Sequence, residues 1–114
     1  MKFYHAFGYE IQHLRVSNGF TQSQLGLPHG AVSLFEKGKR LPSEDQIEAM
    51  CKAMGMSGQT ERLKVLRSLS ILRCRAGEVH VHYASFLDAL INRVRVNGSD
   101  DGFWRRMAAA IENA

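Results

Sequence analysis

Residues 21–42 read TQSQLGLPHGAVSLFEKGKRLP, and this stretch decides which fold the sequence predicts. Thr21 and Gln24 have the spacing of a helix-start motif, in which a hydroxyl and an amide satisfy backbone N–H groups reciprocally. Gly26 favours a turn after a very short helix, and a second helical run ends at Gly38. The apolar residues of that run recur at helical spacing: Ala31, Val32 and Phe35. Two helices joined by a glycine-containing turn form a helix-turn-helix arrangement.

Helices are also predicted on both sides of this motif. A first helix is expected over residues 8–17, and the aromatic-rich residues 1–7 either extend it by half a turn or contact a partner. After a basic loop, Ser43 and Gln46 form a capping box for a helix that runs to about Met54. One face of that helix is apolar and is expected to be core: Ile47, Met50, Cys51 and Met54.

Many residues of this part of the chain match the pattern of one protein family. In the first helix they are Gly8, Ile11, Leu14 and Arg15. At the start of the second helix they are Gly19, Phe20, Thr21, Gln22 and Leu25. Beyond it they are Gly26, Leu27, Ala31, Val32, Ser33, Phe35, Glu36, Gly38, Lys39, Arg40, Pro42 and Ser43. On these positions the chain resembles the phage-repressor and Cro-like (xenobiotic-response-element type) helix-turn-helix family over roughly residues 8–57.

The resemblance implies one ion pair, and the sequence departs from the family at one place. The arginine that ends the first helix in this family meets the glutamate near the end of the recognition helix, which implies a pair between Arg15 and Glu36. About four residues, the second half of the second helix, are absent between Leu25 and Gly26. Four residues are close to one helical turn, so the loss shortens the helix by about 6 Å and changes its phase by only about 40°. We therefore expect the two helices to pack, but less deeply.

The resemblance also implies which side chains contact DNA, with a recognition helix at about residues 28–37 in the major groove. Phosphate contacts are expected from the start of the second helix and from the basic loop: Gln22, Ser23, Lys37, Lys39 and Arg40. Base-facing positions are His29, Gly30, Ser33 and Leu34. Glycine has no side chain to contact a base and leucine can contact only a thymine methyl, so base contacts depend mainly on His29 and Ser33.

The net charge of +4 fits a polyanionic partner, but the excess is not centred on the motif. Residues 1–58 contain six Lys and Arg against five Asp and Glu, a balance of +1, whereas residues 59–114 contain nine against six, a balance of +3. Most of the second excess comes from Arg62, Lys64, Arg67, Arg73 and Arg75. These side chains form either a solvated helix face or a second phosphate-contacting surface.

The second half of the chain is expected to be helical and to join two copies. Residues 60–74 have more apolar positions than a single buried stripe needs, which favours burial on two sides, with a partner subunit as the second side. Residues 78–82 alternate and are interpreted as an extended connector. Two more helices are expected over residues 83–94 and from about residue 99. The last of them has an apolar face: Phe103, Trp104, Met107, Ala108 and Ile111.

Signals for other classes of protein are missing from the sequence. It contains no glycine-rich phosphate loop, GxSxG turn or HExxH motif, so neither an enzyme nor a cofactor is expected. Cys51 and Cys74 are far apart and are expected to be free thiols, and His80 and His82 lack zinc-site spacing, so no metal is expected. No long apolar run or leader is present, which predicts no membrane span and a cytoplasmic protein.

Taken together, these observations predict an all-α protein with a five-helix repressor-like helix-turn-helix head, followed by C-terminal helices. Residues 1–58 are expected to bind DNA and residues 59–114 to form a dimerisation region. The predicted function is that of a sequence-specific transcriptional regulator, a dimeric repressor or autoregulator that binds double-stranded DNA. The alternative is a protein-binding module, resembling an anti-activator or antitoxin, in which the shortened motif and Leu34 contact a protein partner.

Overall fold

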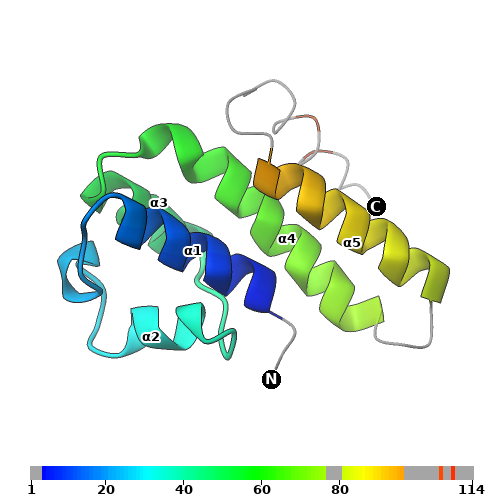
Figure 1. The fold of residues 1–114 in the computed structure, drawn as a ribbon, viewed down its shortest axis with the longest axis horizontal. Coiled ribbons are helices and arrows are strands. Elements are labelled where there is room, and N and C mark those ends of the chain that lie inside the picture. The colour runs from blue at the N-terminus through cyan, green and yellow to red at the C-terminus, as the bar shows by residue number, and fades with distance from the viewer. Residues whose placement is uncertain (1–3, 77–80, 97–105, 107–108, 110–114) are drawn as a thin grey trace.

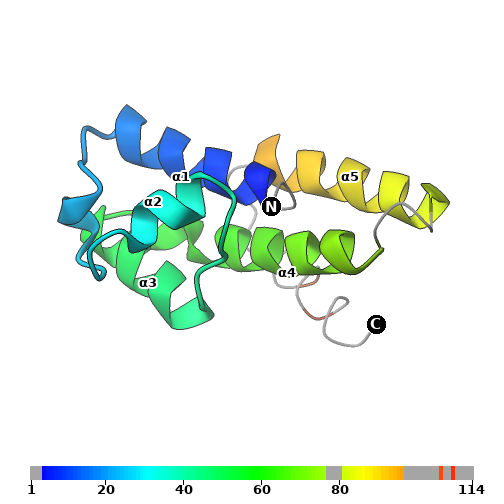
Figure 2. The same ribbon diagram turned by 90° about the horizontal axis from the view of Figure 1, so that it is seen from below.

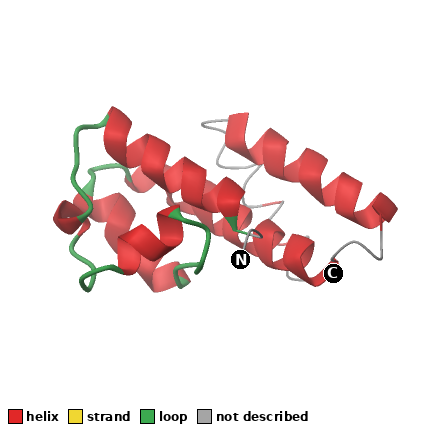
Figure 3. Cartoon of the chain, turned by 60° about the horizontal axis from the view of Figure 1, so that its bottom comes forward, coloured by secondary structure: helices red, strands yellow, loops and turns green. Residues whose placement is uncertain are grey.

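The fold is all-α in the computed structural model, which describes residues 4–76, 81–96, 106 and 109. Within these residues there are five α-helices, two 3-10 turns and no strand, and Figure 3 shows only helix and loop there. The helices are α1 (His5–Ser17), α2 (Ala31–Glu36), α3 (Glu44–Ala53), α4 (Thr60–Ala76) and α5 (Val81–Val96). The 3-10 turns are η1 (Ser23–Leu25) and η2 (Ser57–Gln59). The predicted all-α helix-turn-helix class is confirmed.

The long helix α4 packs against α1, α3 and α5. Figure 2 shows α1 and α5 in one layer above α4, with α2 and α3 below α1. Helix α4 contacts α1 and α3 and makes its most extensive contact with α5. Four of its apolar residues are fully buried: Leu63, Val65, Leu66 and Leu69. One hydrophobic core therefore runs from α1 to α5.

Burial of α4 on two sides was predicted, but the covering element was not. The sequence favoured a partner subunit, whereas the structure places α5 of the same chain there, with Leu87 and Val94 in the shared core. The expectation of a partner subunit on this face is therefore wrong, because a helix only a few residues further along the chain buries the same apolar surface.

Two local predictions in the first half are confirmed by backbone geometry and burial. Ser43 and Gln46 form the capping box in both directions, with N–O distances of 2.9 Å and 3.1 Å. The four apolar residues of α3 and its C-terminal cap are buried: Ile47, Met50, Cys51 and Met54. Helix α1 begins at His5, and Phe7 is fully buried, so the end of the aromatic segment from His5 to Phe7 extends the first helix, while residues 1–3 lie outside the described residues.

Two predictions about the second half need correction or fall outside the described residues. Val81 and His82 lie in the first turn of α5, so the part of the expected connector that is described is helical. Residues 78–80 and the expected last helix from about residue 99, apart from the isolated residues 106 and 109, lie outside the described residues.

Most of the basic residues of α4 make contacts within the chain and do not form a freely solvated face. Arg62 is buried and donates to Glu10 of α1 at 2.9 Å. Lys64 pairs with Glu48, and Arg67 Nε donates to the carbonyl oxygen of Pro42 at 2.7 Å. Arg73 pairs with Asp88 of α5 at 2.9 Å, and Arg75 is exposed. Four of these five side chains therefore join elements of the chain to one another.

Helix α1 packs on α2 at a glycine because any larger residue would meet backbone. A Cβ at Gly8 would overlap the carbonyl oxygen of Phe35 and would lie 2.7 Å from that of Glu36. Backbone atoms at the end of α2 cannot move aside as a flexible side chain can, so the close approach of the two helices depends on Gly8.

We predict that Gly8→Ala lowers the free energy of unfolding by about 2 to 3 kcal/mol, since overpacking against backbone forces the helices apart. The measurement is the midpoint of urea unfolding. Gly58→Ala is the matched control, because a Cβ there has open space, and it should change stability by less than about 1 kcal/mol. Equal stability of the two variants would contradict the described packing of α1 on α2.

The ion pair between Glu10 and Arg62 gives a second prediction. Both side chains are at most 8% exposed, so Glu10→Gln leaves a buried guanidinium without its counter-charge. The expected loss is about 3 to 5 kcal/mol in urea unfolding. Glu48→Gln removes a carboxylate that is 55% exposed and should cost less than about 1 kcal/mol. The prediction fails if the two losses are alike.

Candidate nucleic-acid interface

The segment between α1 and α3 contains a helix-turn-helix in which the second helix is reduced to one 3-10 turn. The turn η1 is anchored by Leu25, which is 1% exposed. Gly26 follows with φ 74°, and Gly30 precedes α2 with φ 83°. Left-handed backbone at these two positions favours glycine, so Gly30 has a conformational role at a position where the sequence suggested a base contact.

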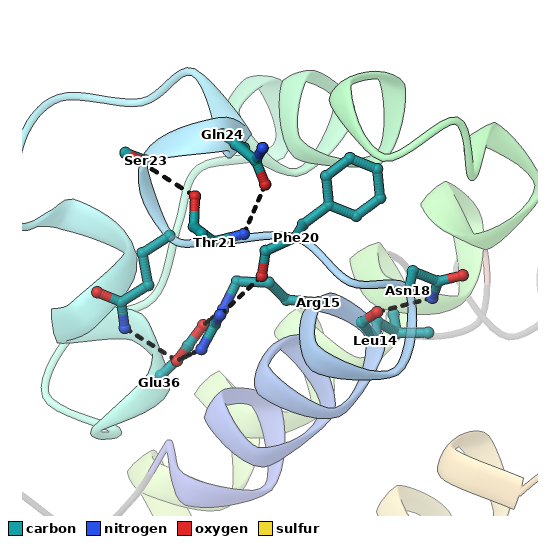
Figure 4. A network of polar contacts seen from close by, with 9 residues as sticks. Leu14, Arg15, Asn18, Phe20, Thr21, Ser23, Gln24 and Glu36 are labelled. Carbon is teal, nitrogen blue, oxygen red and sulfur yellow. Dashed lines mark hydrogen bonds and ion pairs between the residues drawn. The ribbon is translucent and has the colours of Figure 1, made fainter.

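A network of four polar groups fixes this segment against α1 (Figure 4). Arg15 donates to both carboxylate oxygens of Glu36, from Nε at 2.6 Å and from Nη2 at 2.9 Å. Its Nη1 donates to the carbonyl oxygen of Phe20 at 2.9 Å. Gln22 Nε2 donates to Glu36 Oε1 at 3.1 Å. The pair implied by the family resemblance is therefore present and is joined to the turn before η1.

The electrostatics of this network follow from its geometry. Hydrogen bonds to Glu36 are the main cause that raises the pKa of Arg15 above its usual value, although partial burial acts in the opposite direction. The Arg15 and Glu36 side chains are only 13% and 5% exposed. A bidentate guanidinium–carboxylate pair of this kind fixes orientation as well as distance. It therefore holds the end of α2 at a set angle to α1.

The helix-start motif at Thr21 is only half formed. The Thr21 amide donates to Gln24 Oε1 at 2.7 Å, as predicted. The Thr21 hydroxyl lies 3.2 Å from the Ser23 hydroxyl. The backbone N–H of Gln24 donates to the Thr21 carbonyl oxygen, also at 3.2 Å. The reciprocal bond to the Thr21 hydroxyl is replaced by a backbone turn, which fits a helix of a single turn.

Eight of the nine predicted DNA-contacting residues are exposed. They are Gln22, Ser23, His29, Gly30, Leu34, Lys37, Lys39 and Arg40. The ninth, Ser33, is half-buried. Leu34 is 37% exposed, and the buried residues of α2 lie on the other side of the helix: Ala31, Val32 and Phe35. At six residues, α2 is about 9 Å long, so it points few side chains outward, chiefly those of Ser33 and Leu34.

Five of the nine predicted residues line a hollow with a volume of about 840 Å³, which we call the η1–α2 hollow. Those five are Gln22, Ser23, His29, Gly30 and Ser33. The other four follow further along α2 and in the loop after it: Leu34, Lys37, Lys39 and Arg40. The hollow lies between the single turn η1 and α2, at the place where the sequence predicts shallow packing.

Several residues of the hollow were not among the predicted contacts. The polar ones are Arg15 and Thr21, and the apolar ones are Phe20, Leu27, Pro28 and Val32. The missing helical turn was the signal that could have identified them, because removing side chains between η1 and α2 exposes what they would cover. Neither composition nor helical periodicity contains this information.

The described part of the chain lacks two other kinds of feature. No group of three or more His, Cys, Asp and Glu side chains is placed there to hold a metal ion. No helix among the described residues is long and apolar enough to cross a membrane. Burial raises the pKa of the Cys51 thiol, and both cysteines are free.

Comparison with known proteins gives one match. A family model described as a helix-turn-helix domain matches residues 6–64, which is just over half of the chain. The match begins in α1, ends in the first turn of α4 and includes the whole η1–α2 hollow. No curated protein and no solved structure matches the chain.

The Arg15–Glu36 pair predicts that a variant with one unpaired charge is less stable than a variant from which both charges are removed. Arg15→Met leaves the Glu36 carboxylate buried and unpaired, and the free energy of unfolding should fall by about 3 to 5 kcal/mol. In Arg15→Met/Glu36→Leu no charge is left unpaired, and this double variant should be more stable than Arg15→Met by at least about 1 kcal/mol. Urea unfolding measures the stability of both variants. A double variant that is no more stable than Arg15→Met would contradict the pairing.

Proposed function

The chain belongs to the helix-turn-helix domain family, and on that premise we propose that it is a sequence-specific transcriptional regulator of the Cro-like type. In this proposal α2 enters the major groove of double-stranded DNA. The observation that supports it most is the exposure of eight of the nine expected contact residues along one continuous segment, from η1 to the loop after α2.

The phosphate contacts in the proposal come from two places. Lys37, Lys39 and Arg40 are exposed directly after α2, where side chains can reach the DNA backbone on one side of the groove. Gln22 and Ser23 would contact it on the other side. Because the Gln22 amide already donates to Glu36, its side-chain oxygen and backbone N–H remain the groups that a water or phosphate could meet.

The base contacts in the proposal are few. His29 is exposed and can donate or accept a hydrogen bond. Ser33 can also donate or accept, and Leu34 can contact a thymine methyl. Because so few side chains can contact bases, we expect them to discriminate only modestly between DNA sequences. We expect DNA shape and the spacing of two half-sites to supply the rest of the specificity.

We further propose that the regulator is a homodimeric repressor or autoregulator, with DNA binding in residues 1–58 and dimerisation in residues 59–114. The face of α4 that the sequence offered for a partner is covered by α5, so a dimer must use another surface. Phe86 of α5 is 58% exposed, and a large exposed apolar side chain in this region supports a contact there.

A second candidate function is protein binding by the same segment, and one observation favours it. The lining of the η1–α2 hollow includes the apolar residues Phe20, Leu27 and Val32 beside its polar residues, and exposed Leu34 lies on the same helix as Val32. Apolar side chains in a concave surface suit contact with a protein side chain.

The proposal is tested by selecting bound DNA fragments from a random pool at near-physiological salt. A dimeric regulator should enrich inverted repeats, and its affinity should fall steeply with salt, by a log–log slope of about −5 if each protomer contacts three phosphates. Lys39→Ala should weaken binding to all fragments alike, whereas His29→Ala should reduce the preference for the selected site. Lys52→Ala, an exposed charge on α3, is the matched control and should change neither.

Two results would overturn the DNA proposal. One is a pool with no enriched sequence together with Lys39→Ala and Lys52→Ala proteins that bind DNA alike. The other is a captured protein partner that is lost on Leu34→Glu while DNA retention is unchanged, which would establish protein binding instead.

A further inference from the structure

We propose that the cavity between α1 and α5 is a binding site for a carboxylate, with Arg95 as the cation that recognises it. The cavity has a volume of about 400 Å³ and is lined by Tyr9, Glu10, His13, Asn92 and Arg95. That volume lies in the usual range for small-ligand pockets. Figure 2 shows α1 and α5 one after the other in the same layer, with α4 in the layer beneath them.

Arg95 has an unused hydrogen-bonding capacity at this cavity. Its Nε is buried and has no hydrogen-bond partner among the described residues. The nearest carboxylate oxygen, Glu10 Oε2, is 3.7 Å from Nε, which is too far for a hydrogen bond. The side chain as a whole is 30% exposed, and Arg95 is one of the residues that line the cavity. A guanidinium has five N–H donors in a planar fork that matches a carboxylate.

The local charge favours a monoanion. Glu10 is 8% exposed, and its Oε1 accepts from Arg62 Nη1 at 2.9 Å. Arg62 and Arg95 thus share one carboxylate, which leaves an excess of one positive charge here among the described residues. A ligand with a single negative charge balances that excess, and buried charges are stable only when they are balanced in this way.

The remaining lining residues suit the uncharged part of such a ligand. Arg95 lies over the Tyr9 ring, with 5.0 Å between the guanidinium carbon and the ring centroid. His13 stacks on Tyr9 with centroids 6.2 Å apart and planes 6° from parallel. Tyr9 is 56% exposed, so it offers apolar surface beside the cation, and Asn92 adds an amide that can donate or accept.

The cavity is separate from the proposed DNA-contacting segment. Gly8 and Arg15 face α2, whereas His13 and Glu10 lie about 140° and 160° around the helix from Gly8, at 100° per residue. Figure 1 shows α2 and α5 on different sides of α1. A duplex held against α2 therefore does not reach Arg95, and the carboxylate is not a substitute for a DNA phosphate.

The test uses the full chain, with benzoate as probe and neutral benzamide as its matched control, followed by nitrogen-15 NMR. Benzoate should give saturable shifts at the Arg95 Nε–H and the Tyr9, His13 and Asn92 amides, and benzamide should not. Arg95→Gln should weaken benzoate binding at least tenfold, while Arg75→Gln, an exposed arginine outside the cavity, should leave it unchanged. If Arg95→Gln does not fold, Asn92→Ala, at an exposed position, should still weaken binding at least threefold.

A second titration separates a free acid from the side chain of a protein partner. It uses a short capped peptide with one glutamate and the same peptide with glutamine in its place. Shifts with benzoate indicate a small-molecule acid, and shifts with the glutamate peptide alone indicate a protein partner with the same chemistry. The proposal is wrong if neither probe gives saturable shifts, if benzamide binds as benzoate does, or if folded Arg95→Gln protein binds benzoate unchanged.

Discussion

The bidentate pair between Arg15 and Glu36 is the interaction on which the helix-turn-helix depends. It joins the end of α1 to the end of α2, and the same arginine holds the Phe20 carbonyl while the same glutamate holds Gln22. In a motif with a full second helix, apolar packing could fix these elements. Here η1 is a single turn anchored by Leu25, so the polar network supplies much of the orientation.

The shortened second helix changes what the chain can offer to a partner. Helix α2 is short and has its apolar side in the core, so its outer surface consists of a few side chains beside the η1–α2 hollow. Such a surface suits recognition in which the basic loop after α2 provides affinity and a few side chains provide discrimination. The same surface also fits the second proposal, in which the partner is a protein.

Helix α1 packs against the rest of the chain through two different faces. One face packs on α2 through Gly8 and Arg15, and the other meets α4 and α5 through the buried carboxylate of Glu10. The basic residues that raise the net charge of the second half are largely used in such internal contacts. The charge of a region was therefore a poor guide to the surface on which a polyanion would bind.

Sequence alone determined the features that depend on neighbours within a few residues: the helical class, the turn at Gly26, and the Ser43–Gln46 capping box. The family pattern added the Arg15–Glu36 pair and the list of exposed residues from Gln22 to Arg40. Only the tertiary structure decided that α5 covers α4, that Arg62 is buried against Glu10, and that Arg95 Nε lacks a hydrogen-bond partner among the described residues. These contacts join residues far apart along the chain, and neither periodicity nor composition specifies which distant surfaces meet.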